Sequence, residues 1–323
     1  MQRRSVLMGA ASLLLLAAAV AVAPRAAGAQ DFPSKPITLL VGFGAGGMTD
    51  VSSRIIGEKL EQILGVRVLV ENKPGAGGML AVGAAAEMPA DGHTIVSFAA
   101  ESPFTSTYQG RPVNLDDWAM VGGYMPQERV LFARQDAPFG TMEELIEYAK
   151  GNPVTFADGG SFWSSRVMEA FAKKHELTVR LVPFRSGAEG SAAILGGHVT
   201  LAETGVGTSA WHSAREGGLK ILATLTPGGL GQFGYPDVPT LDRFGADYLV
   251  RTEYGYAVRG DTPPEIVAKL SDALRQAIED PEVHARLTEI DLTPEWTPPE
   301  EYKEMLRGIT GDAEELSVYL KEE

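Results

Sequence analysis

The sequence predicts an α/β fold with two domains, each a mixed, mostly parallel β-sheet flanked by helices. Short apolar runs rich in β-branched residues alternate with helical patterns along almost the whole chain, and many of these runs end at glycine. The 323 residues, 44% of them hydrophobic, suffice for two domains with separate cores. Strand-like segments near residues 130 and 254 bracket a second alternating set. We therefore expect a discontinuous first domain, 30–130 plus 254–323, and an inserted second domain, 131–253.

Residues 1–29 are predicted to be a signal peptide that is removed on export. Arg3 and Arg4 form a basic start, an apolar core follows over Leu13–Ala23, and Ala27-Gly28-Ala29 is a small-residue cleavage site. This apolar core is too short to span a bilayer comfortably, so we expect cleavage after Ala29 and a periplasmic protein. The arginine pair also makes a loose twin-arginine signal, a route for proteins exported already folded.

The first domain is expected to open with two strand–loop units. An apolar run that begins at Ile37 stops at the glycine cluster 42–47, and a helical pattern then continues to Gly65. A second run, from Val68, stops at the similar cluster 75–78. The elements expected next are a helix over Met79–Met88, a strand over Thr94–Ala100, a loop at Glu101-Ser102-Pro103 and an irregular stretch over 105–125.

The second domain is expected to repeat the alternation. The capping box Thr141-Met142-Glu143-Glu144 marks the start of its first helix. Its expected strands cover Val130–Arg134, Val154–Ala157, Val179–Phe184, Val199–Glu203 and Leu219–Leu225, and its further helices cover Ser164–His175, Gly190–Leu195 and Thr208–Arg215. A strand over Tyr254–Val258 and two helices opened by proline pairs then return the chain to the first domain.

The glycine loops are the first candidate for a ligand site. Glycine lets the chain approach a ligand closely, and the N–H groups at the start of the helix that follows Phe43–Gly47 point into the same space. Such a helix start attracts carboxylate or phosphate without a cationic side chain. The loop at Glu101-Ser102 is expected at the same carboxyl edge of the sheet, where open α/β sheets bind ligands.

The composition excludes several classes of function. Without the three arginines of the signal peptide, 25 basic residues face 42 acidic ones, a net charge of −17, so nucleic acid and anionic lipid are not expected partners. The absence of cysteine excludes disulfides, thiolate metal sites and a cysteine nucleophile. The five histidines lack metal-ligand spacing, and no catalytic motif occurs. We expect no enzyme, no catalytic or metal-binding residue and no cofactor.

Five segments in a fixed order resemble a known family. They are FPSKPITLLVGFGAGGMTD, VRVLVENKPGAGG, PADGHT, VPFRSGAEGSAAILGGHVT and PDVPTL. Over roughly the whole mature chain, the sequence resembles the solute-binding proteins of the tripartite tricarboxylate transporter system, of the Bug or TctC type. The resemblance implies a two-lobed periplasmic binding-protein fold of type II that closes on a small di- or tricarboxylate or aromatic acid. It also implies delivery of that acid to a membrane permease, and we expect a monomer.

The resemblance implies a ligand site between the two lobes. In the family, the loop matching Phe43–Gly47 binds a carboxylate mostly through backbone N–H groups. The loop matching Ala99–Ser102 belongs to the same lobe, whereas the segment matching Gly159–Ser165 and a residue near Thr204 come from the other. The ligand-binding residues expected on this basis are Phe43, Gly44, Ala45, Gly46, Gly47, Ala100, Glu101, Ser102, Gly160, Ser161, Trp163, Ser164, Ser165, Phe184, Arg185 and Thr204.

The sequence departs from the family pattern at several of these positions. The family usually has proline where Gly42 stands, which predicts a more mobile loop here. It often has aspartate at the position of Thr204, and the loss of this acid favours plain or aromatic carboxylates over ligands with an amino group. Where the family has lysine or a similar residue, this chain has Arg185. Trp163 follows a glycine pair and precedes serines, so we expect it to be exposed in a loop as a wall for a flat, apolar ligand.

Two other functions stay open on sequence alone. Gly42–Gly47 is formally a G-x-G-x-x-G motif after a strand, and Glu71 closes the next strand, where a ribose-binding acid would lie. These features would suit an exported dinucleotide-binding oxidoreductase, although Glu71 follows Gly42 by 29 residues rather than the roughly 20 expected. A soluble receptor that presents its ligand to a sensor kinase would have the same sequence features as a transport protein.

Overall fold

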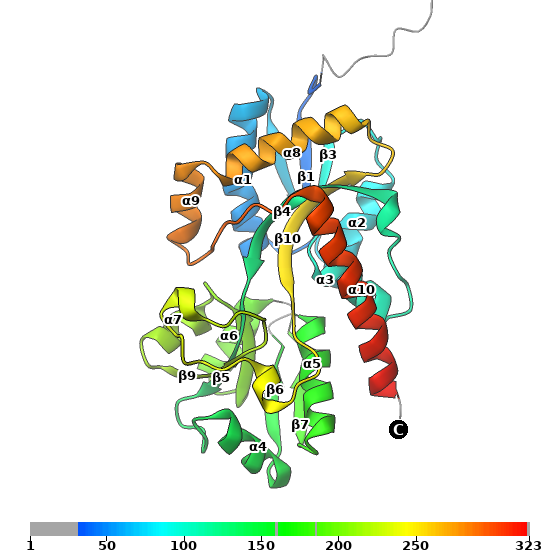
Figure 1. Ribbon diagram of the computed structural model, residues 1–323. Coiled ribbons are helices and arrows are strands. Elements are labelled where there is room, and N and C mark those ends of the chain that lie inside the picture. Colours follow the sequence, from blue (N-terminus) through cyan, green and yellow to red (C-terminus); the bar gives the residue numbers. More distant parts are fainter. Residues whose placement is uncertain (1–31, 159–160, 185, 322–323) are drawn as a thin grey trace, which may run out of the picture. The chain divides into compact units, whose positions relative to one another are not determined.

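The computed structural model describes residues 32–158, 161–184 and 186–321 (Figure 1). The predicted signal peptide and its cleavage site lie outside these residues, as do Gly160 and Arg185 of the predicted ligand site. Within the described part, no helix is both long and apolar enough to cross a membrane.

The first sheet is built from strands of the N-terminal and C-terminal parts of the described chain. Its strand order is β2 (Val68–Asn72), β1 (Ile37–Val41), β3 (Thr94–Ser97), β10 (Thr252–Arg259) and β4 (Trp118–Gln127). Strand β1 pairs in parallel with both β2 and β3, whereas β10 is antiparallel to both of its neighbours. Four of the five strands therefore run in one direction. We call this sheet and the helices packed on it lobe I.

The second sheet has the same plan. Its strand order is β7 (Val179–Val182), β6 (Val154–Ala157), β8 (Leu201–Gly205), β5 (Arg129–Arg134) and β9 (Leu219–Thr224). Strand β6 pairs in parallel with β7 and β8, and β5 is the antiparallel strand. We call this sheet and its helices lobe II. The prediction of two mixed, mostly parallel sheets is confirmed.

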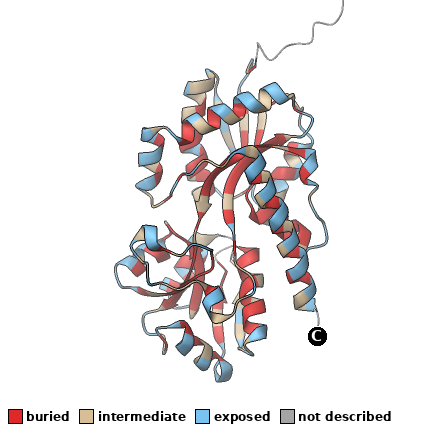
Figure 2. Ribbon diagram, viewed as in Figure 1, coloured by how far each residue is buried: buried red, intermediate tan, exposed pale blue. Residues whose placement is uncertain are grey.

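Helices flank both sheets, and most of these helices have buried residues on the side that packs against the protein and exposed residues on the other (Figure 2). The helices of lobe I are α1 (Met48–Leu64), α2 (Met79–Ala86), α3 (Glu101–Tyr108), α8 (Pro264–Ile278), α9 (Pro281–Thr288) and α10 (Pro299–Lys321). Those of lobe II are α4 (Met142–Gly151), α5 (Phe162–Lys174), α6 (Gly187–Leu195) and α7 (Ser209–Arg215). Short 3-10 helices cover Ala76–Gly78, Leu115–Asp117, Gly231–Phe233 and Leu241–Phe244. Helix α10 packs on α3 and β4 of lobe I and also on α5 of lobe II.

The chain passes between the sheets twice, at Glu128 and between β9 and β10. Strand β4 ends at Gln127 in the first sheet and β5 starts at Arg129 in the second, so a single residue separates them. The predicted domain boundaries near 130 and 254 fall close to these passages, but the division into domains at those residues stays a prediction.

One stretch was predicted wrongly. Residues 105–125 were expected to be irregular, yet they contain the end of α3 and most of β4. Strand β4 carries Gly122, Gly123 and Pro126, which weaken a strand signal in sequence. Both glycines are required by packing, because a Cβ atom at Gly122 would lie 2.3 Å from the Trp296 ring and one at Gly123 would lie 2.8 Å from the Tyr302 ring.

The room left by Gly123 is filled by the carboxyl group of Glu253, on β10. Atom Oε1 of Glu253 is buried and has no hydrogen-bond partner among the described residues. Burial raises the pKa of Glu253 to about 7, and the nearby charges of Glu295 and Glu301 act in the same direction. The folded protein therefore holds this proton more tightly than the unfolded chain does.

We expect Glu253→Gln to change how stability depends on pH. With a folded pKa of about 7 and an ordinary value of 4.5, the stabilisation from the protonated carboxyl is complete below pH 4.5 and is lost as the pH rises to 7. The neutral glutamine avoids this loss, so the variant should exceed wild type by on the order of 2 kcal/mol at pH 8 and match it near pH 4.5. Urea unfolding at both pH values measures the difference. The exposed Glu314 provides the control, Glu314→Gln, and equal pH profiles for Glu253→Gln and wild type would contradict the expectation.

Candidate ligand site

The loop between β1 and α1 is exposed and is held in place by hydrogen bonds to Asp50 and Asn72. Gly44, Ala45 and Gly46 are exposed, and their N–H groups differ in what they bind. The Gly46 N–H donates to the Asp50 carboxylate at 2.8 Å, whereas those of Gly44 and Ala45 donate to no other described residue. Asn72 fixes the loop by donating to both the Phe43 carbonyl and Asp50, at 3.1 and 2.9 Å.

Asp50 is a positioning residue of this loop. Its carboxylate is buried and receives hydrogen bonds from Gly46 and Asn72 and an ion pair from Arg54 at 2.8 Å. Burial acts to raise the pKa of Asp50, but the hydrogen bonds from Arg54, Gly46 and Asn72 outweigh it and lower the pKa below its usual value. Asp50 is therefore a charged anchor for the loop at neutral pH.

The two glycine clusters of the sequence meet in space. A Cβ atom at Gly42 would lie 2.6 Å from the Gly78 Cα atom, so the two backbones approach too closely for any side chain at Gly42. The Gly42 N–H donates to Ser97 Oγ at 3.0 Å, a bond that proline could not make. Ser102 donates to the Gly77 carbonyl at 2.7 Å and holds the second cluster against α3.

Helix starts in the two lobes differ in how their N–H groups are satisfied. In each lobe three helices follow three strands that run in parallel: α1, α2 and α3 in lobe I, and α5, α6 and α7 in lobe II. The three in lobe I have no side-chain cap. The three in lobe II are capped by hydroxyl groups, from Ser161, Ser186 and Thr208. At α2 and α3, however, backbone carbonyls accept early N–H groups, namely those of Gly78, Leu80, Ser102 and Phe104. The start of α1 is therefore the candidate for donors that an external anion could use.

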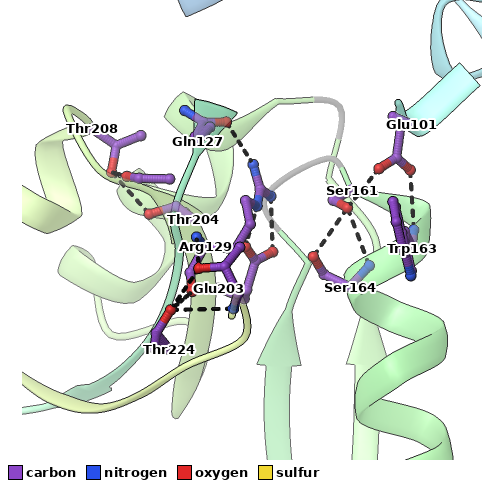
Figure 3. A network of polar contacts seen from close by, with 12 residues as sticks. Glu101, Gln127, Arg129, Ser161, Trp163, Ser164, Glu203, Thr204, Thr208 and Thr224 are labelled. Atoms are coloured by element: carbon purple, nitrogen blue, oxygen red, sulfur yellow. Dashed lines mark hydrogen bonds and ion pairs between the residues drawn. The ribbon is translucent and has the colours of Figure 1, made fainter. Parts of the chain in front are cut away.

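The start of α5 is additionally occupied by a carboxylate from lobe I (Figure 3). Glu101, in the first turn of α3, accepts hydrogen bonds from Trp163 N–H and from the Ser161 hydroxyl, both at 3.0 Å. Burial raises the pKa of Glu101 above its usual value, while the bond from Trp163 and the charge of Arg129 oppose this rise. The helix start at which Ser161, Ser164 and Ser165 were expected to bind a ligand is therefore filled by the protein itself.

Trp163 was expected to be exposed in a loop, and this expectation was wrong as well. Helix α5 already begins at Phe162, and Trp163 is 1% exposed. Its ring stacks on Phe104 of α3, with ring centroids 4.4 Å apart and an interplanar angle of 10°. Such a buried aromatic pair contributes about 0.5–1.5 kcal/mol beyond the area it buries. Trp163 thus joins the two lobes, and no face of its ring is available as a ligand wall.

The other predicted site residues lie close to these loops but are largely buried. Ala100, Ser102, Ser164, Ser165 and Thr204 are at most 3% exposed. Ser165 donates to Asp158 at 2.8 Å, and the same carboxylate accepts the Phe184 N–H at 3.0 Å. The Thr204 hydroxyl is hydrogen-bonded to that of Thr208 at 2.8 Å. These polar atoms hold the loops of lobe II together.

A buried ion pair that sequence reasoning missed lies beside these loops. Arg129, at the start of β5, donates from Nε and Nη2 to the two carboxylate oxygens of Glu203 on β8, with the Nη2 bond at 2.9 Å (Figure 3). Both residues are buried, Glu203 completely. Burial alone would lower the pKa of Arg129, but the charge of Glu203 outweighs burial and raises it. The guanidinium is therefore charged.

Gln127 connects this pair to lobe I. Its side-chain oxygen accepts from Tyr254 OH at 3.0 Å and from Arg129 at 3.4 Å, and its amide nitrogen donates to the Met48 sulfur at 2.9 Å. Met48 is the first residue of α1. A polar chain thus runs from the glycine loop through the interlobe passage into lobe II. The only sequence signal for it was the position of Gln127 and Arg129 at the expected strand crossing.

The described residues show no metal centre, and a sizeable hollow lies away from the predicted site. No group of three or more histidine, aspartate or glutamate residues in the described part could hold a metal ion. A hollow of about 570 Å³ lies in lobe II between the start of α4, β9 and the loop over 234–244, and it shares no residue with the predicted site.

We expect the Arg129–Glu203 pair to tolerate joint replacement but not the loss of one partner. Arg129→Met leaves a fully buried carboxylate without its counter-ion, which costs about 3–5 kcal/mol of unfolding free energy. The double variant Arg129→Met/Glu203→Leu removes the stranded charge and should recover most of this loss. Urea unfolding of wild type, the single and the double variant measures it, and a double variant no more stable than Arg129→Met would contradict the expectation.

The chain matches known proteins over most of its length. A family model described as the tripartite tricarboxylate transporter family receptor, TctC, matches residues 52–308. The "UPF0065 protein in gbd 5'region" of Cupriavidus necator is 34% identical over 312 residues, which cover 94% of this chain and 93% of that one. A solved periplasmic transporter is 26% identical, with a TM-score of 0.77 over 88% of this chain and 97% of its own. A TctC solute binding protein from Polaromonas is 25% identical, with a TM-score of 0.71 over 88% of this chain and 98% of its own. The predicted resemblance is confirmed: this chain has the two-lobed fold of the periplasmic binding proteins and belongs to the TctC family of solute-binding receptors.

Proposed function

We propose that this protein captures a small organic carboxylate in the periplasm and delivers it to the permease of a tripartite tricarboxylate transporter. The observation that carries the proposal is the start of α1. The exposed loop Gly44–Gly46 leads into a helix whose cap, Gly47, supplies no side-chain hydrogen bond. The first intrahelical bond is made by the Val51 N–H, so the N–H groups of Met48 and Thr49 precede it. Together with those of Gly44 and Ala45, they are the donors for an acid.

These donors are strong enough for the affinity that a binding protein needs. A micromolar dissociation constant corresponds to about −8 kcal/mol. Hydrogen bonds to a charged acceptor contribute roughly 1.5–3 kcal/mol each, so three or four of them suffice after the cost of ordering the ligand. The acidic surface of the protein does not prevent this binding, because charges more than about 8–10 Å away are screened by salt.

Phe43 is the aromatic surface that we assign to the apolar part of the ligand. Its side chain is half-buried next to the exposed glycines, and its ring lies edge-on to that of Tyr254, with centroids 6.3 Å apart. This pair is supported by Gln127, which binds Tyr254 OH. Phe43 thus takes the role that the sequence suggested for Trp163, and it favours acids with an apolar or aromatic body.

Export forms part of the same proposal. Residues 1–29 have the basic start, apolar core and small-residue cleavage site of a signal peptide, which would place the mature protein in the periplasm. The family membership supports the same compartment. Within the proposal, the protein acts as a monomer with no cofactor, and the permease recognises it when the acid is bound.

Ligand classes can be separated with the mature protein, starting at residue 30. Thermal-shift measurements with di- and tricarboxylates, aliphatic and aromatic monocarboxylates, NAD and NADP should show stabilisation by an acid and none by a nucleotide. At a ligand concentration of a hundred times Kd the expected stabilisation is about 2.7 kcal/mol, a rise of several degrees in Tm. Stabilisation by a nucleotide, together with turnover of a substrate, would instead support an oxidoreductase built on the G-x-G-x-x-G loop.

The glycine loop can be tested with a single added charge. A Cβ atom at Gly44 meets nothing within 4 Å, so the side chain in Gly44→Asp fits without disturbing the fold. Its carboxylate should repel the ligand and weaken acid binding at least tenfold, about 1.4 kcal/mol, as measured by calorimetry. Gly44→Asn has nearly the same shape without the charge and should retain most of the affinity. Wild-type affinity in Gly44→Asp would remove this loop from the site.

A further inference from the structure

Glu101 differs from the other polar residues around the site because it reaches from one lobe to a helix start of the other. It lies in the first turn of α3, in lobe I, and is only 6% exposed. One carboxylate oxygen accepts from Trp163 N–H at 3.0 Å and from Thr105 Oγ1 at 3.3 Å, and the other accepts from Ser161 Oγ at 3.0 Å. Three donors therefore converge on one carboxylate at the start of α5.

The direction of these bonds follows from the neighbouring serines. The Ser161 oxygen accepts the Ser164 N–H at 3.1 Å and the Ser164 hydroxyl at 3.0 Å. Its single proton is left for Glu101, and a backbone N–H such as that of Trp163 can only donate. Every partner of Glu101 in this arrangement donates, which is the environment of an ionised carboxylate rather than of a protonated one.

Three N–H groups at the start of α5 are consequently engaged within the protein. Trp163 N–H binds Glu101, Ser164 N–H binds the Ser161 hydroxyl, and Ser165 N–H already binds the Ser161 carbonyl at 3.3 Å within the helix. A ligand carboxylate could bind the Trp163 N–H and the Ser161 hydroxyl only by displacing Glu101. The displaced side chain would then be a buried charge without its hydrogen bonds, a costly state. The start of α1, by contrast, has no side-chain cap.

The charges around α5 act in the same direction. Glu101, Glu203 and Asp158 are buried carboxyl groups near this helix start, and Arg129 is engaged bidentately by Glu203. Electrostatic interaction links Arg129 to both Glu203 and Glu101. In this low-dielectric region a further carboxylate would meet an excess of negative charge over the described side chains.

We propose that Glu101 is a specificity-determining residue: its carboxylate takes the place at the α5 start that a second ligand carboxylate would need, so the protein selects acids with one carboxylate. This inference rests on the proposed function, and it narrows the ligand class from organic acids in general to monocarboxylates. The acid group binds at the α1 start, and the opposite end of the ligand is uncharged.

Matched acids of equal chain length test the proposal directly. Calorimetry would compare each monoacid from butanoate to octanoate with the diacid of the same chain length, from succinate to suberate. The two acids of a pair differ only in the second carboxylate. Wild type should bind the monoacid of the best pair at least tenfold more tightly than the diacid. In Glu101→Ala the donors of Trp163 and Ser161 become free and a negative charge is lost, so the ratio should move at least tenfold toward the diacid. The control Glu147→Ala removes an exposed carboxylate of lobe II that is paired with Lys150, and it should leave the ratio unchanged.

The outcomes separate this inference from the proposed function. If wild type binds diacids as tightly as monoacids, or if Glu101→Ala leaves the ratio unchanged, the role of Glu101 is refuted while acid binding stands. If wild type binds no acid of either series and none of the acids in the thermal-shift measurements, the proposed function fails first. Should Glu101→Ala not fold, Glu101→Gln keeps the shape and one acceptor but drops the charge. It should then move the ratio toward the diacid as well, and an unchanged ratio in that variant would also refute the role.

A second measurement needs no knowledge of the natural ligand. Glu101→Ala leaves a small cavity at the α5 start with free donors, which formate or acetate should fill. Each should raise the Tm of Glu101→Ala progressively as its concentration increases, beyond its effect on wild type and on Glu147→Ala at the same ionic strength. An equal effect on all three proteins would show that Glu101 does not hold a carboxylate position at this helix.

Discussion

The start of an α-helix presents N–H groups that must find acceptors, and much of this structure depends on where those acceptors come from. In lobe II they come from the protein, through the hydroxyls of Ser161, Ser186 and Thr208. In lobe I the corresponding helices have no side-chain caps. Two lobes with the same strand order thus differ in whether side chains cap these helices. Of the uncapped starts, that of α1 is the one at which we propose that an acid binds.

The contact between α3 and α5 couples the two lobes through both apolar and polar groups. Phe104 and Trp163 stack in a core that continues from one lobe into the other. Beside them, the buried Glu101 carboxylate accepts hydrogen bonds from Trp163 N–H and the Ser161 hydroxyl in place of water. The apolar stack excludes water, and the low dielectric that results strengthens the charged hydrogen bonds next to it. A polar side chain on α3 thereby becomes part of the chemistry of the opposite lobe.

Hydrophobic periodicity was sufficient to predict both sheets, most helices and the exposed glycine loop, because these depend on local patterns. It failed for β4, whose glycines are dictated by Trp296 and Tyr302, far along the chain. The site was only partly predictable for the same reason. Glu101 meets Trp163 across 62 residues, and Arg129 meets Glu203 across 74. A sequence shows that such residues can ionise but not which partner each will find, and partners decide whether a helix start is open.

The repeated strand order also constrains how the chain can fold. In the first sheet β10 lies between β3 and β4, and β4 has no other strand beside it. All five strands of the second sheet are contained in 129–224, before β10 is reached. During synthesis from the N-terminus, lobe II can therefore complete its sheet while β4 still waits for a neighbour. The last 72 residues, from Thr252 onward, contain β10, which joins β3 to β4. A chain interrupted before these residues would therefore leave an unpaired strand edge at β3, in the same sheet that carries the glycine loop.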